Sequence, residues 1–232
     1  MRYIAKNVNN TPQILTGFIQ QQNNAGVNLN YGAFPNAEQL NNILRQEQRL
    51  ICCYCTLRID HFQGNSEGGS HNEHLEPQHG PHANPARQLD YTNIFACCNY
   101  STGKQPSLQH CGIKKGHHLI TDFLTNINCR QYFKYNVLGE IIPRGVYETQ
   151  EDFQNNLYQL TPDQVNAFNT IQILGLNCNS LVKVRKDNID IIIRLSGQLT
   201  RPQAQAKIQR INNENPFLPL VEMLIYYLNQ VN

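Results

Sequence analysis

The segment from residue 51 to residue 120 most constrains how this 232-residue chain can fold. It holds all eight histidines and six of the eight cysteines, but few apolar side chains. Such a stretch cannot bury enough apolar surface to fold by the hydrophobic effect alone, whereas a bound metal ion stabilises small modules of this composition. The sequence therefore predicts three parts: an N-terminal segment with a lead-in helix (1–50), a metal-dependent core (51–120) and a helical region (121–232).

The cysteines are spaced as zinc ligands. Cys52 and Cys55 form a C-x2-C pair, whose two thiolates can reach one tetrahedral ion from a single tight turn. The second pair comes from Cys97 or Cys98 together with Cys111, because adjacent cysteines do not easily share one small site. We expect a structural zinc ion, with the ligands Cys52, Cys55, Cys98 and Cys111. The alternative is that buried free thiols merely fill the core.

A possible catalytic pair lies between the two cysteine groups, in the run His71-Asn-Glu73-His74-Leu-Glu-Pro77-Gln. Hydrolysis of a phosphodiester needs a base for water and a cation for the charge that develops on the phosphate. A neutral His74 suits the first task because its ordinary pKa is near physiological pH. Glu73 suits the second, since neighbouring residues on a strand point to opposite faces. We expect Pro77 to end that strand.

Together these motifs resemble the HNH endonucleases that have a ββα-metal site. In particular, they look like the PtuB type, the nuclease of Septu and retron-linked anti-phage systems. The resemblance extends to the opening residues 1–6 and to the segment 173–185, and so covers nearly the whole chain. Its motifs are Cys52-x-Tyr54-Cys55, Glu73-His74-x-x-Pro77, Asn93-x4-Cys98 and His110-Cys111-x-x-Lys114-Lys115-Gly116.

The resemblance implies an α+β, mainly helical fold, in which a zinc-stapled ββα-metal core is embedded in a helical domain. It implies that His74 is the general base, that Glu73 is the first ligand of a catalytic magnesium or other divalent ion, and that Asn93 pins the loop between the strands and helps to orient the base. The four cysteines above match the structural zinc ligands of the family.

Two departures from the family pattern bear on the metal sites. The second pair of cysteines is not a C-x2-C pair, because a loop that contains Lys104 separates Cys98 from Cys111. The helix position that usually supplies a metal ligand just after the last cysteine is Gly112. A substitute ligand could be His110, His117 or His118, or the ion could rely on Glu73 and water molecules.

The substrate and partner follow from the same resemblance. We expect phosphodiester hydrolysis in nucleic acid, with DNA as the default and tRNA as an alternative, together with an ABC- or SMC-like ATPase of the PtuA type that docks on residues 121–232. The net charge is only +2, so nucleic acid must be engaged locally, and the basic stretch 104–118 offers contacts. The candidate contacts are Lys104, Lys114 and Lys115.

Two alternative functions stay open: a non-catalytic zinc module that binds nucleic acid, and a degenerate HNH protein that scaffolds the ATPase.

The remaining patterns concern compartment and helices. The start lacks an apolar signal segment, and the apolar run 218–228 is too short to cross a bilayer, so we expect a cytoplasmic protein without a membrane partner. Thr161 followed by Pro162 predicts a helix start. Cys129 and Cys178 are expected to be core thiols. Further helices are expected over 13–21, 37–50, 122–133, 180–198, 202–212 and 219–229, and a hairpin over 137–142.

Overall fold

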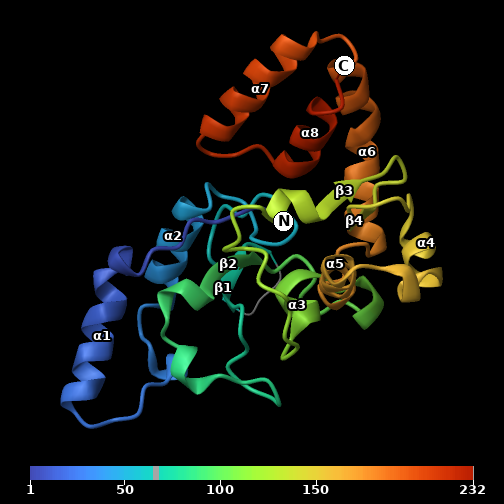
Figure 1. Ribbon diagram of the computed structural model, residues 1–232. Helices are drawn as coiled ribbons and strands as arrows, with labels where there is room; N and C mark the ends of the chain where they lie inside the picture. Colours follow the sequence, from blue (N-terminus) through green and yellow to red (C-terminus); the bar gives the residue numbers. More distant parts are fainter. Residues whose placement is uncertain (65–67, 232) are drawn as a thin grey trace.

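The computed structural model describes residues 1–64 and 68–231 as a mixture of helices and small antiparallel sheets (Figure 1). At its centre, strand β1 (Ser70–His74) pairs in antiparallel fashion with strand β2 (Ile94–Cys98). The short helix α3 (Cys111–Lys115) follows and packs on β2. These three elements carry Glu73, His74, Cys98, Cys111 and Lys115.

Strand β2 forms because its sequence, Ile-Phe-Ala-Cys-Cys, is a continuous apolar run, and all five residues are buried. Strand β1 is polar and takes its conformation from pairing with β2. On the other edge of β2, the side-chain amide of Gln48 replaces a third strand. Its Nε2 donates to the carbonyl of Ala96 at 2.8 Å, and its Oε1 accepts from the Ala96 amide at 2.7 Å.

The other helices surround this centre (Figure 1). A second two-stranded sheet pairs β3 with β4 across the turn at Gly139, which has a φ of 87°. Helices α6, α7 and α8 lie together at one side, coloured orange to red in the figure. The bounds of these elements are α1 Gln13–Asn24, α2 Ala37–Glu47, β3 Phe133–Tyr135, β4 Ile141–Pro143, α4 Gln150–Asn155, α5 Pro162–Ile173, α6 Asn179–Ser196, α7 Arg201–Asn213 and α8 Val221–Leu228.

Most of the helices expected from the sequence are present within a few residues of their predicted bounds. The predicted start of α5 is confirmed, since the Thr161 side chain accepts from the Gln164 amide and Pro162 is the first helical residue. The helix expected over 122–133 is wrong. Only a short 3-10 turn, Cys129–Tyr132, forms there, because the Asn126 side chain accepts from the Asn128 amide, which an α-helix would bond to the Leu124 carbonyl.

The main core is continuous across the three parts predicted from the sequence. It includes Met1, Leu44, the residues of β2, Ile120 and Met223. Of the two expected core thiols, Cys129 is buried and Cys178 is partly exposed. In the part of the chain that the structure describes, no helix combines the length and apolar character needed to cross a bilayer.

Candidate metal centre and catalytic cluster

Four buried thiols converge beside the central sheet, and we call them the cysteine cluster. Cys52 and Cys55 flank a tight turn in which the Thr56 amide donates to the Cys52 carbonyl at 3.1 Å. Cys98 ends β2, and Cys111 begins α3 with a φ of 58°. The four Sγ atoms lie within 4.8 Å of one another. These are the four residues predicted from the spacing.

The donor set of the cysteine cluster fits a metal ion such as zinc. The Sγ atoms of Cys55 and Cys98 are 3.7 Å apart, and those of Cys52 and Cys111 are 3.9 Å apart. Zn–S bonds of about 2.3 Å in a tetrahedron place the sulfur atoms about 3.8 Å apart. Burial acts to raise the pKa of the Cys52 thiol, but hydrogen bonding with Cys111 and other thiols lowers it well below its ordinary value, which favours a thiolate at this one position.

Two further thiols and one histidine lie beside this cluster. Cys53 and Cys97 are buried and form a second group of close thiols with Cys52. The Cys97 Sγ accepts a hydrogen bond from the Gly112 amide at 3.2 Å. The Nδ1 atom of His110 lies 3.3 Å from the Cys111 Sγ, so this residue, a candidate ligand for the catalytic ion, borders the cysteine cluster instead.

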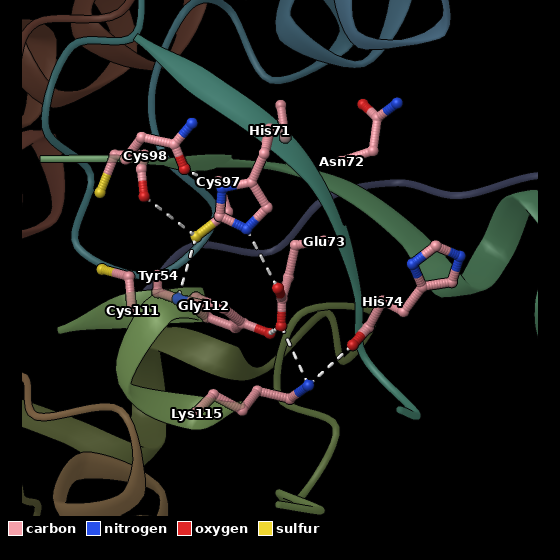
Figure 2. Close-up of polar contacts among 12 residues, drawn as sticks. Tyr54, His71, Asn72, Glu73, His74, Cys97, Cys98, Cys111, Gly112 and Lys115 are labelled. Carbon is pink, nitrogen blue, oxygen red and sulfur yellow. Dashed lines mark hydrogen bonds and ion pairs between the residues drawn. The ribbon is translucent and has the colours of Figure 1, made fainter. Parts of the chain in front are cut away.

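A second cluster forms around Glu73 (Figure 2). Its Oε1 accepts from the Lys115 ammonium at 2.9 Å and from the Tyr54 hydroxyl at 3.2 Å, while its Oε2 lies 3.2 Å from the Nε2 of His71. Burial acts to raise the pKa of the Glu73 carboxyl, but Lys115 and His71 outweigh it and lower the pKa to about 2. Glu73 is therefore a buried, ionised carboxylate with fixed partners.

His71 is the functional candidate that sequence reasoning missed. It precedes Glu73 by two residues on β1, so both side chains share one face of the sheet, the face of Cys97. Burial acts to lower the pKa of His71, but the hydrogen bond and charge of Glu73 raise it above its ordinary value. The alternation of side chains along a strand predicts that His71 lies beside Glu73.

His74 lies on the opposite face of β1, as Figure 2 shows. Its Nε2 donates to the Gln88 carbonyl at 2.8 Å, and its Nδ1 accepts from the Gln78 side-chain amide at 2.8 Å. The ring packs edge-on against the ring of Tyr31 at 4.6 Å between centroids. Burial lowers the pKa of His74 to about 4, so the imidazole is neutral at pH 7 with its lone pair on Nδ1.

Asn93 fastens the loop that connects β1 to β2. The side chain is fully buried. Its Oδ1 accepts from the Glu76 amide at 2.7 Å, and its Nδ2 donates to the carbonyls of Glu76 and Arg87 at 3.1 and 3.0 Å. The neighbouring residue of Arg87 is Gln88, which holds His74. Asn93 thus fixes the backbone that orients the imidazole.

The three lysines predicted to contact phosphate differ in their exposure. Lys115 is only 1% exposed, and its Nζ donates to the His74 carbonyl at 2.8 Å as well as to Glu73, so its charge is used inside the protein. Lys114 is partly exposed and donates to the Pro106 carbonyl, while Lys104 is exposed. His117, another candidate ligand, is exposed, and its ring lies 6.1 Å from that of His79.

Comparison with known proteins identifies no family for this chain. No protein-family model matches the chain, and a search of curated proteins found no match. What can be said of its function rests on the residues described above.

Proposed function

We propose that the chain is a metal-dependent endonuclease of the HNH type, in which His74 is the general base and Glu73 is a ligand of the catalytic divalent ion. One observation carries the proposal. A neutral, oriented imidazole and an ionised, buried carboxylate are adjacent on one strand, next to four converging thiols. Base and anionic ligand are the two groups that metal-assisted phosphodiester hydrolysis demands of a protein.

The cysteine cluster is the structural part of this proposal. Zinc held by Cys52, Cys55, Cys98 and Cys111 would join the turn before β1, the end of β2 and the start of α3. That junction fixes the position of α3, which carries Lys115 to Glu73. It also holds Cys111 in a left-handed backbone conformation that a non-glycine residue adopts at a cost of about 1 kcal/mol or more.

His74 removes the proton from water in this proposal. The Gln88 carbonyl holds Nε2 in the protonated form, which leaves the Nδ1 lone pair to accept the proton. The Gln78 amide donates to that lone pair, so the attacking water must take its place when substrate arrives. When bound at Glu73, the divalent ion would polarise the phosphodiester and stabilise the leaving oxygen.

The substrate is nucleic acid, with DNA as the default and tRNA as the alternative. The partner is an ABC- or SMC-like ATPase that docks on residues 121–232. The exposed apolar residues of α6 support an interaction on that side, namely Val184, Ile191, Ile193 and Leu195. Because Lys115 is buried, few basic side chains near the site can contact phosphate, so we predict that the isolated chain binds nucleic acid weakly.

The experiment compares wild type with His74→Ala on plasmid DNA and on total tRNA, with Mg²⁺ or Mn²⁺ and with the ATPase supplied. We expect His74→Ala to abolish cleavage while zinc content is unchanged. Cleaved RNA should lack 2′,3′-cyclic phosphate ends, since water and not the 2′-hydroxyl is the nucleophile. Equal cleavage by both proteins would refute His74 as the base.

A second candidate function, a non-catalytic scaffold for the ATPase, is favoured by one observation. Glu73 and His74 are only 7% and 5% exposed, which is little for residues that must meet a substrate. Absence of cleavage in wild type, together with retained binding of the ATPase, would support this reading.

A further inference from the structure

The space beside Glu73 is shaped by a glycine. A Cβ at position 112 would lie 2.5 Å from the Glu73 Oε2 and 2.7 Å from the His71 Nε2, closer than real Cβ atoms come to such neighbours. The backbone of α3 therefore approaches the two side chains as closely as it does only because residue 112 has no side chain. Helix α3 supplies no ligand at this point, and the imidazole of His71 fills the space.

His71 is oriented as metal-binding histidines are. The Nδ2 of Asn99 donates to the Gly64 carbonyl, so the Oδ1 of the same amide faces the His71 Nδ1. This oxygen accepts a hydrogen bond from the Nδ1–H group. When the imidazole is neutral, this bond places its lone pair on Nε2, which without a metal ion would instead carry a proton and donate to Glu73. A hydrogen-bond acceptor on the second ring nitrogen is the usual outer partner of a metal-bound imidazole.

The two facing atoms have the separation of neighbouring ligands around one ion. The Nε2 of His71 and the Oε2 of Glu73 are 3.2 Å apart. Ligand bonds of about 2.1 Å at a right angle place two donor atoms about 3.0 Å apart. The other oxygen of Glu73 is occupied by Lys115 and Tyr54, which keeps Oε2 turned toward His71.

We propose that His71 and Glu73 together bind the divalent ion, and that the imidazole makes the site prefer a first-row transition ion over Mg²⁺. The proposal rests on the proposed function in that it concerns the same ion. Mg²⁺ takes oxygen ligands and keeps its waters, whereas transition ions accept imidazole nitrogen in a mixed site. Asn99 is the positioning residue that presents His71.

The probe is Mn²⁺, because its preference for hard ligands leaves the zinc thiolates undisturbed. The full, zinc-loaded chain is titrated with Mn²⁺ and with Mg²⁺ by calorimetry, and the bound Mn²⁺ is examined by pulsed electron paramagnetic resonance for coupling to a ¹⁴N nucleus. The variants are His71→Asn and Glu73→Gln. The matched control is His82→Asn, which changes an exposed histidine in the loop after β1.

We expect wild type to bind Mn²⁺ at least tenfold more tightly than Mg²⁺ and to show ¹⁴N coupling. His71→Asn should lose the coupling and bind Mn²⁺ at least about tenfold more weakly, as even the loss of an outer partner does. His82→Asn should bind as wild type does. If His71→Asn keeps both affinity and coupling while Glu73→Gln loses affinity, this inference is wrong and the proposed Glu73 site stands. If Glu73→Gln also binds as wild type does, the proposed catalytic ion site itself is wrong.

Discussion

The buried ammonium of Lys115 gives the sharpest test of how the candidate site is built. The sequence suggested a phosphate contact, whereas the structure buries the side chain and joins its Nζ to the Glu73 carboxylate and the His74 carbonyl. Lys115→Met keeps most of the apolar stem but removes the charge. The carboxylate then stays buried with one cation fewer beside it.

The size of the effect follows from the pairing. Removing one partner of a buried ion pair typically costs about 3–5 kcal/mol. Because His71 and Tyr54 still contact Glu73, we expect the lower end, about 3 kcal/mol. For a chain of this size, that loss lowers the melting temperature by roughly 6–12 °C.

The matched control for this experiment is Lys114→Met, which changes the adjacent lysine, whose side chain is partly exposed. We expect its effect to stay within about 0.5 kcal/mol. Urea denaturation and thermal melts of both zinc-loaded variants, without other divalent ions, measure the difference. Equal stability of the two variants would show that the Lys115–Glu73 ion pair does not stabilise the fold. If Lys115 instead contacted phosphate, its variant would keep the stability of wild type and reduce the salt dependence of nucleic-acid binding.

Three other changes test separate parts of the structure. Gly112→Ala should push His71 away from Glu73, cost about 1–3 kcal/mol by overpacking, and weaken Mn²⁺ binding at least tenfold, as urea denaturation and calorimetry would measure. Cys98→Ser should lose zinc, as elemental analysis would detect, and should melt at a lower temperature than wild type. Burial acts to raise the pKa of Glu222, but its buried pairing with arginines lowers it. The ionised carboxylate therefore stabilises the fold above pH 4.5, and this contribution is lost as pH falls through the lower folded pKa. Glu222→Gln should therefore cost stability at pH 6 and flatten the loss of stability below pH 4.5, measured by urea denaturation at each pH.

Local chemistry made part of this structure predictable. The C-x2-C pair and the two later cysteines identified the four thiols that converge. Thr161 and Pro162 fixed a helix start by capping and by a preset φ. The expected helix over 122–133 does not form because the Asn126 side chain takes the Asn128 amide, which the helix would need.

The roles of Lys115 and Gly112 could not be predicted correctly because they depend on tertiary neighbours. Lys115 looks like any surface lysine until the sheet brings Glu73 against it. Gly112 read as a missing ligand, and only the packing of α3 on the sheet reveals that its small size admits His71. His71 itself was within reach, since residues two apart on a strand share a face.

If His74 is the base in metal-assisted phosphodiester hydrolysis, it should act on a small diester as well as on nucleic acid. The most direct measurement is the rate at which the purified chain, with Mn²⁺, hydrolyses thymidine 5′-p-nitrophenyl phosphate, a diester that needs no partner protein and no 2′-hydroxyl. We predict that His74→Ala slows hydrolysis at least about 10²-fold with its zinc retained, while His82→Ala leaves the rate unchanged. Equal rates for His74→Ala and wild type would show that His74 is not the base.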